Sequence, residues 1–120
     1  MISDAEAVLM HALWASSPMT TEQLLSQVGE SQGWQEGTVK SLLNRLLNKG
    51  AISAEREGRR YLYSPVLTRD DYITQQSTSL LDRLFGGRVA PLVAHFSAHT
   101  KLSARDKAQL RKLLKELDDE

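Results

Sequence analysis

The sequence contains no cysteine, and this absence excludes disulfide bonds, thiolate metal sites and thiol nucleophiles. No apolar run approaches the roughly 18 residues of a membrane span, and no basic region followed by a hydrophobic stretch opens the chain. We therefore expect a soluble, cytoplasmic protein with no membrane partner. A length of 120 residues suits one ordinary domain or two small ones, which favours a small regulator or binding module.

The chain also lacks net charge, because 15 basic and 15 acidic side chains cancel. Taken alone, this argues against a nucleic-acid partner, since phosphate neutralisation drives most of such binding. The distribution is uneven, however: residues 1–37 hold five acids and no Lys or Arg, whereas residues 38–60 hold six bases and two acids. A local basic region is sufficient for a small DNA-reading unit.

Residues 35–50 carry the clearest pattern in the chain. Apolar side chains recur there at helical spacing and predict one buried helix face: Val39, Leu42, Leu43, Leu46 and Leu47. The opposite face and its flanks collect polar and basic residues: Thr38, Lys40, Ser41, Asn44, Arg45, Asn48 and Lys49. These residue types contact base edges and phosphates, and Gly50 can end the helix in the left-handed conformation. The segment is typical of a recognition helix.

Two helices are predicted before this segment and a hairpin after it. Capping-box patterns at Ser3 and Thr20 each precede apolar residues at helical spacing, and Gly29 is expected to stop the second helix. Residues 52–56 and 59–64 are β-prone, with Glu57 and Gly58 as the tight turn between them. Three helices and a basic hairpin describe a winged helix-turn-helix, in which the third helix enters the major groove.

Three further helices are predicted after the hairpin, beginning near residues 68, 89 and 103, and their apolar faces are too extensive for these helices to bury alone. A two-fold homodimer is the simplest partner, because it also places two recognition helices on one face of the DNA. The candidate dimerisation residues are Leu80, Leu84, Leu92, Phe96, Leu110 and Leu113. The predicted fold is mainly α with a small β-hairpin wing: a winged helix-turn-helix in residues 1–67 and a helical dimerisation domain in residues 68–120.

Three motifs in this order, TVKSLLNRLLNKG, EGRRYLYSP and SLLDRLFGG followed by LVAHF, resemble those of the penicillinase-repressor family, the BlaI/MecI/CopY group of bacterial regulators. The similarity covers nearly the whole chain. It implies an N-terminal winged helix, a C-terminal helical dimerisation domain, and repression by a homodimer that occupies an inverted-repeat DNA operator.

The sequence departs from two branches of that family. In β-lactam-responsive members, a membrane-bound sensor protease leads to cleavage between an Asn and a Phe. The resemblance therefore implies a sensor protease as a further partner. At the matching position, however, this chain has His95 followed by Phe96, so a His stands where those members have the Asn. In copper-responsive members a C-terminal cysteine cluster binds metal, and a chain without cysteine cannot use that mechanism.

The predicted DNA-binding residues come from the recognition helix and the wing: Thr38, Lys40, Ser41, Asn44, Arg45, Asn48, Arg59 and Arg60. Arg45 suits bidentate contact with guanine or phosphate, whereas the hydroxyl and amide side chains could read bases or only contact phosphate. A merely solvated surface is the alternative interpretation of these charges. The alternative function is a winged-helix protein-interaction module without sequence-specific DNA binding.

No residue pattern predicts catalysis, a metal or a cofactor. His95 and His99 have the i, i+4 spacing of two metal ligands, but no third ligand is apparent nearby. Acids and hydroxyls form no catalytic motif, so an enzyme is not predicted. Trp14 and Trp34 are expected in the core, and the tyrosines of the wing are expected to pack against the domain or a dimer border rather than on bases.

Overall fold

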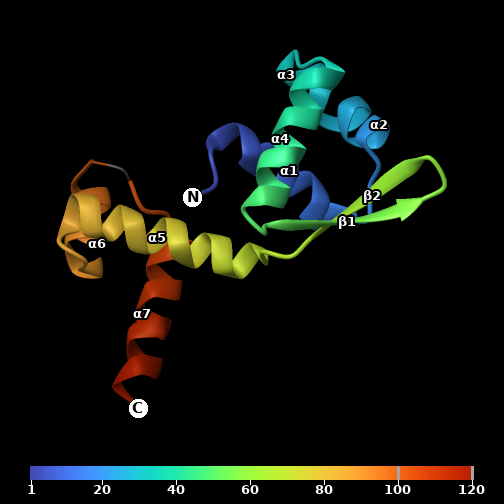
Figure 1. Cartoon of the computed structure of the whole chain (residues 1–120). Coiled ribbons are helices and arrows are strands. Elements are labelled where there is room, and N and C mark those ends of the chain that lie inside the picture. The colour runs from blue at the N-terminus through green and yellow to red at the C-terminus, as the bar shows by residue number, and fades with distance from the viewer. Residues whose placement is uncertain (100, 120) are drawn as a thin grey trace. The chain divides into compact units, whose positions relative to one another are not determined.

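The computed structural model describes residues 1–99 and 101–119 and divides the chain into two compact units, Met1–Thr74 and Gln75–Glu120 (Figure 1). The first unit holds α1 (Asp4–Ala15), α2 (Thr21–Leu24), η1 (Leu25–Gly29), α3 (Glu30–Gln32), α4 (Glu36–Asn48), β1 (Ile52–Glu57) and β2 (Arg60–Pro65). Helix α5 (Arg69–Phe85) begins in the first unit and continues into the second, which also holds α6 (Val89–His99) and α7 (Ala104–Asp118). This is the predicted mainly helical chain with one antiparallel hairpin.

The core of the first unit lies between α1, α2 and α4, and both predicted capping boxes help to form it. The Ser3 hydroxyl accepts from the Glu6 amide at 3.1 Å while the Glu6 carboxylate accepts from the Ser3 amide at 3.0 Å. Thr20 and Gln23 repeat this exchange at the start of α2. The helices bury their apolar faces together, and the core side chains include Leu9, Met10, Leu13, Leu24, Val39, Leu43 and Leu46. Both tryptophans pack against this core, as predicted.

The prediction that Gly29 stops the second helix is wrong. Residues 21–32 are one helical stretch in which α2 passes through the π-helical turn η1 into α3, and the left-handed residue that follows is Gly33. Gly29 has a helical φ of −62° and is buried. A Cβ at Gly29 would lie 2.7 Å from the Leu25 Cδ1 atom, so the glycine allows close packing inside the helix rather than ending it.

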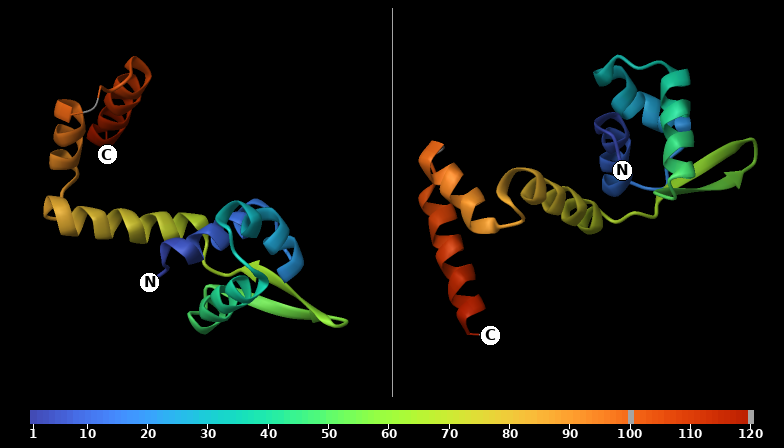
Figure 2. Two further views of the ribbon diagram at one scale, coloured as in Figure 1. Left: turned by 90° about the horizontal axis from the view of Figure 1, so that it is seen from above. Right: turned by 60° about the vertical axis from the view of Figure 1, so that its left-hand side comes forward.

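Strands β1 and β2 form a hairpin, the wing, that projects away from the helices of the first unit (Figure 2). The predicted turn is displaced by one residue: Glu57 pairs with Arg60, so the two turn residues are Gly58 and Arg59. Gly58 has a φ of 63° while Arg59 has no positive φ, the sign pattern of a type II′ hairpin turn, which requires glycine at the first position. Arg59 therefore lies at the tip of the wing.

Backbone hydrogen bonds join the wing to the segment before α2. The Met19 amide donates to the Tyr63 carbonyl at 3.0 Å, and the Tyr63 amide donates to the Met19 carbonyl at 2.8 Å. Tyr63 also packs against the core, as expected, whereas Tyr61 is 47 % exposed and does not. The base of the wing is thus held in a fixed place beside α2.

The helices after the wing begin and end close to the predicted residues. The Thr68 hydroxyl accepts from the Asp71 amide at 3.1 Å at the start of α5, and Gly86 and Gly87 follow its end. The predicted border between residues 67 and 68 lies just before α5 and remains a prediction of where the DNA-binding part ends. Within the described ranges, no helix is both long and apolar enough to cross a membrane.

Candidate nucleic-acid interface

Helix α4 has one buried face and one exposed polar face. Val39, Leu43 and Leu46 are fully or almost fully buried, and Leu42 is 4 % exposed. All six predicted DNA-binding residues of this helix lie on the exposed side: Thr38, Lys40, Ser41, Asn44, Arg45 and Asn48. The apolar face fixes the helix on the core, so the polar face is presented to a partner in a defined orientation.

The two ends of α4 are set by backbone contacts rather than by a side-chain N-cap. The Trp34 amide donates to the Gly29 carbonyl at 2.7 Å just before the helix, and Gln35 makes no side-chain cap. At the other end Gly50 has a φ of 72°, as its predicted role requires, and the Ala51 amide donates to the Leu46 carbonyl at 3.0 Å. The chain is thereby turned from α4 directly into β1.

The wing places exposed arginines near the exposed face of α4. Arg59 lies in the turn and Arg60 opens β2, where its guanidinium is 3.5 Å from the Glu57 carboxylate. On α4, the Lys40 ammonium is 3.2 Å from the Glu36 carboxylate one turn earlier. Both ion pairs are more than half exposed, so each contributes little to stability and a phosphate can compete for the cation.

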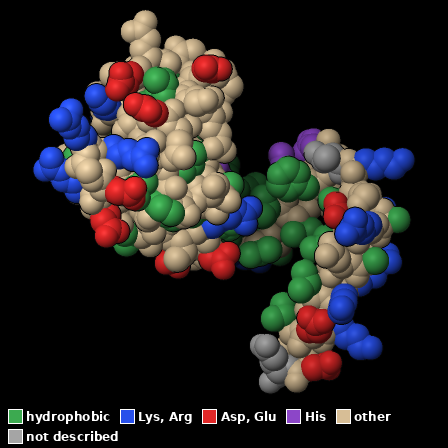
Figure 3. Space-filling view, turned by 90° about the vertical axis from the view of Figure 1, so that its right-hand side faces the viewer, with side chains coloured by type: hydrophobic (Ala, Val, Ile, Leu, Met, Phe, Trp, Pro, Cys, Tyr) green, Lys and Arg blue, Asp and Glu red, His purple; other side chains and the backbone are tan. Residues whose placement is uncertain are grey.

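A cleft of about 410 Å³ lies between α4, the start of α2 and the wing. Lys40 and Asn44 line it from α4, and Arg59 and Arg60 line it from the wing. The space-filling view shows Lys and Arg side chains gathered on one side of this unit, with Asp and Glu among them (Figure 3). The structure therefore brings together four of the eight predicted DNA-binding residues around one concave surface, while Thr38, Ser41, Arg45 and Asn48 lie on α4 outside it.

The other lining residues of this cleft were not predicted as site residues: Thr20, Thr21, Glu22, Glu36, Tyr61 and Tyr63. The sequence indicates Thr20 only as a helix cap. Its place beside the wing depends on the backbone pairing of Met19 with Tyr63, which joins residues far apart in the sequence. No local pattern in the sequence indicates such a pairing.

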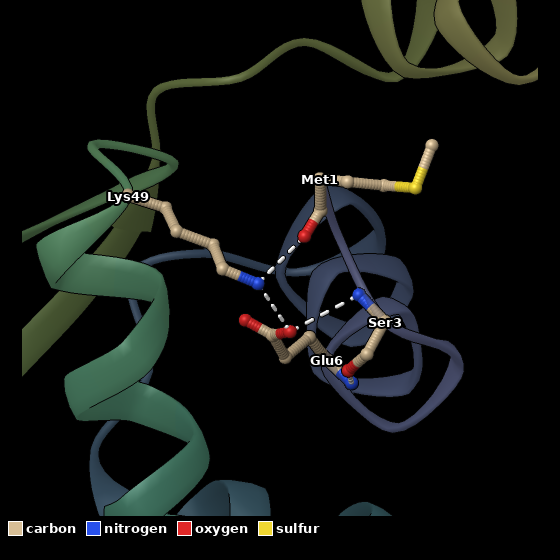
Figure 4. Close-up of polar contacts among 4 residues, drawn as sticks. All are labelled: Met1, Ser3, Glu6 and Lys49. Carbon is tan, nitrogen blue, oxygen red and sulfur yellow. Dashed lines mark hydrogen bonds and ion pairs between the residues drawn. The ribbon is translucent and has the colours of Figure 1, made fainter.

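The structure corrects the predicted polar face of α4 at Lys49. Its ammonium donates to the Glu6 carboxylate and to the Met1 carbonyl, both at 2.6 Å, instead of facing outward with Arg45 (Figure 4). Glu6 is 1 % exposed, and one of its carboxylate oxygens has no hydrogen-bond partner in the described part of the chain. Lys49 therefore ties the end of α4 to the start of α1, and it is not assigned to DNA contact.

Burial raises the pKa of the Glu6 carboxyl, but hydrogen bonds from Lys49 and Ser3 and the charge of Lys49 outweigh it, so the pKa lies below its ordinary value of 4.5. A carboxyl whose pKa is lowered by folding stabilises the fold above its ordinary pKa. That stabilisation is lost as the pH falls through the lowered pKa of the folded state.

We expect Lys49→Met to lower the free energy of unfolding by about 2 to 4 kcal/mol at neutral pH, because it leaves a buried carboxylate without its cation. Urea denaturation measures this loss. The matched control is Lys40→Met, which removes an exposed lysine from the same helix and should cost less than about 1 kcal/mol.

The difference between Lys49→Met and the parent chain should shrink as the pH is lowered through the folded-state pKa of Glu6, since a protonated Glu6 no longer needs the ammonium. Equal losses for the two lysine variants, or a difference that does not change with pH, would contradict this role of Lys49.

The second unit has no fully buried side chain among residues 75–99 and 101–119. Of the predicted dimerisation residues, Leu84, Phe96 and Leu113 are 64 %, 46 % and 54 % exposed. Leu80, Leu92 and Leu110 are half-buried. Hydrophobic side chains lie open over these helices (Figure 3). Large apolar side chains exposed together in this way are typical of an interaction surface.

The two histidines of α6 approach one another, with ring centroids of His95 and His99 4.5 Å apart. Phe85 and Phe96 are aromatic neighbours of His95. Among the residues that the structure describes, no third His, Asp or Glu completes a set of metal ligands. The position that matches the cleavage site of the β-lactam-responsive relatives, His95 followed by Phe96, lies inside this helix.

The comparisons with known proteins concern almost the whole chain. The family model described as penicillinase repressor matches residues 2–116. The penicillinase repressor of Bacillus licheniformis is 32 % identical over 115 residues, which cover 96 % of this chain and 90 % of that protein.

Two solved structures resemble the first unit. One is the solution structure of the DNA-binding domain of the repressor BlaI, with 33 % identity and a TM-score of 0.56. The other is Bacillus licheniformis BlaI, in monomeric form, in complex with the blaP half-operator, with 33 % identity and a TM-score of 0.53. Each match covers 60 % of this chain and 88 % of the other.

The winged-helix fold and the resemblance stated from sequence motifs are confirmed by these matches. The matching family is one of transcriptional repressors rather than enzymes, which also confirms the prediction that the chain is not an enzyme. On its fold, its motifs and the match across residues 2–116, the chain belongs to the penicillinase repressor family.

Proposed function

We propose that this repressor acts as a homodimer that binds an inverted-repeat operator, with α4 in the major groove and the wing on the DNA backbone. The observation that carries the proposal is the exposed polar face of α4 beside the wing arginines. This arrangement stands in a unit that is similar to the BlaI domain solved in complex with a half-operator. The buried face of α4 packs on the core, so its polar face is free to reach base edges, as the recognition helix does in other helix-turn-helix proteins.

The residues of the interface divide into two chemical groups. Arg45 and Asn44 have side chains that can form two hydrogen bonds with a guanine or an adenine edge, so we assign them to base reading. Lys40, Arg59 and Arg60 line the cleft beside the wing, where they suit phosphate oxygens. Thr38, Ser41 and Asn48 complete the exposed face and can contact either group.

The open apolar surface of the second unit supports the homodimer. Helices α5, α6 and α7 leave several large apolar side chains exposed, and a second copy of the chain offers a surface of the same chemistry. A two-fold dimer would bring two copies of α4 to half-sites about one DNA turn apart, roughly 34 to 36 Å, or a multiple of that.

Selection of binding sequences from a random DNA pool tests the proposal without knowledge of the operator sequence. The intact chain should recover an inverted repeat whose half-sites are spaced by whole turns of the duplex. Recovery of no preferred sequence, or of a single half-site without a repeat, would contradict the dimeric operator.

Arg59→Ala combined with Arg60→Ala should weaken binding to the selected operator and to random DNA by similar factors, because wing arginines that contact phosphate carry no sequence information. Each lost phosphate contact should also reduce the slope of log affinity against log salt by about 0.9. Titrations at several salt concentrations measure both effects. A loss confined to the operator would instead assign base reading to the wing.

A protein-interaction module is the second candidate function, and the zero net charge is the observation that favours it. The acids Glu22 and Glu36 also line the cleft beside the wing. The selection experiment separates the two functions, because an interaction module would recover no preferred DNA sequence.

A sensor protease is a further partner that we propose only from the family resemblance. The bond between His95 and Phe96 lies within α6, and cleavage of a helical segment requires that segment to open locally. Induction by cleavage at this position therefore requires α6 to unfold transiently.

A further inference from the structure

The start of α5 is held on the first unit by a set of contacts that the DNA-binding surface does not use. We call Trp14, Leu67 and Tyr72 the α5 anchor. The indole Nε1 of Trp14 donates to the Leu67 carbonyl at 2.8 Å, and the Trp14 and Tyr72 rings pack with centroids 5.4 Å apart. All three residues belong to the first unit.

The backbone on both sides of Leu67 is also fixed. The amides of Val66 and Leu67 both donate to the Ala51 carbonyl, at 2.8 and 3.0 Å. After Leu67, Thr68 caps α5, and the Tyr72 amide donates to the Thr68 carbonyl at 3.0 Å. The segment that leads into α5 is therefore hydrogen-bonded to Ala51, just before β1, and to Trp14 of α1, so it is not a free linker.

Tyr72 brings α5 into contact with α1. Its ring is half-buried and also meets the edge of the His11 ring, with centroids 6.1 Å apart. Within its described span, α5 has no fully buried residue. These ring contacts with Trp14 and His11 thus restrain the start of this 17-residue helix.

From this geometry we propose that the α5 anchor sets which spacing between operator half-sites the dimer accepts. Trp14 and Tyr72 would be positioning residues, because neither is among the residues assigned to DNA contact. A helix of 17 residues is about 25 Å long, so a tilt of about 20° at its start moves its far end by roughly 9 Å. That displacement corresponds to two to three base pairs at about 3.4 Å each.

The inference rests on the proposed dimeric operator binding and adds to it. If α5 leads from each DNA-binding unit to the dimer contact, a rigid start of α5 confines the two copies of α4 to few separations. A loosened start would let them reach several separations, and binding at the preferred one would lose part of its effective-concentration gain.

Tyr72→Ala in the full chain tests this inference, with Thr74→Ala as the matched control from the same turn of α5. The probes are a duplex with one half-site and duplexes with the selected inverted repeat whose spacer is lengthened one base pair at a time. For the parent chain and Thr74→Ala, affinity should fall steeply when the spacer changes. For Tyr72→Ala, affinity at the selected spacing should fall about 10-fold and should vary much less with spacing.

Binding to the half-site duplex distinguishes a change in the spacing of the two copies of α4 from a loss of the fold of one DNA-binding unit. Affinity for that duplex should stay within about twofold of the parent, since the contacts of α4 are unchanged. Tyr72→Phe keeps the ring and should restore the spacing dependence of the parent chain. A loss of half-site affinity equal to the loss on the full operator, or an unchanged spacing dependence in Tyr72→Ala, would overturn the inference. If the parent chain itself bound the inverted repeat no better than one half-site, the proposed dimeric binding would fail, and the inference with it.

Discussion

The first unit alone, residues 1–74, should bind the full operator about 10²- to 10⁴-fold more weakly than the intact chain, because a lone unit lacks the effective-concentration gain of a tethered second unit. The core of this unit involves no residue after Leu67, so we expect the fragment to retain its fold. Operator titration of the fragment and the intact chain, alongside sedimentation of each, measures the effect.

Phe96→Ala should produce the same loss from within the intact chain. Phe96 is 46 % exposed on α6, and removal of a large apolar side chain from a packed interface costs about 3 to 5 kcal/mol. The variant should sediment toward monomer and bind the operator more weakly, although Phe96 is not assigned to DNA contact.

The matched control for Phe96→Ala is Ser97→Ala on the same helix, since the Ser97 hydroxyl donates to the Val93 carbonyl of that helix at 2.9 Å. Ser97→Ala should leave both sedimentation and operator affinity unchanged. Equal operator affinity for residues 1–74 and for the intact chain would contradict the prediction that dimerisation contributes to operator affinity.

Arg45→Ala should lower operator affinity by about 5- to 150-fold, which corresponds to the roughly 1 to 3 kcal/mol of a lost base contact. Arg45 lies on the exposed face of α4 and has no ion-pair partner among the residues the structure describes, so no folded contact should be lost with it. Titration with the operator and with random DNA measures the change.

The comparison with random DNA decides the role of Arg45. A base contact should be lost mainly on the operator, whereas a phosphate contact should be lost equally on both. Arg105→Ala, an exposed arginine at the start of α7, is the matched control and should leave both affinities unchanged. An unchanged operator affinity for Arg45→Ala would remove this residue from the interface.

The features that follow from local periodicity were predictable from the sequence. The buried and exposed faces of α4 follow from apolar spacing alone, because a helix on a core must bury one continuous stripe. The capping boxes at Ser3 and Thr20 were predictable for a similar reason, since both partners of each box lie within one turn.

Two features that the sequence did not predict depend on contacts between distant segments, and the error at Gly29 comes from local packing inside one helix. Lys49 falls on the flank of the polar face of α4 in a helical projection, and Glu6, 43 positions earlier, draws its ammonium to α1. Gly29 has the residue type of a helix stop, yet the close packing of Leu25 explains it better. The cleft beside the wing likewise depends on the pairing of Met19 with Tyr63. Periodicity and residue type carry no record of such long-range partners.

Titration of the intact chain with the DNA upstream of its own gene, and with a scrambled duplex of the same length, tests the central claim most directly. Both titrations should be repeated at several salt concentrations. We predict binding to the upstream DNA that is at least about 10³-fold tighter than to the scrambled duplex and that weakens steeply as salt rises. Equal affinity for the two duplexes at every salt concentration would contradict sequence-specific operator binding.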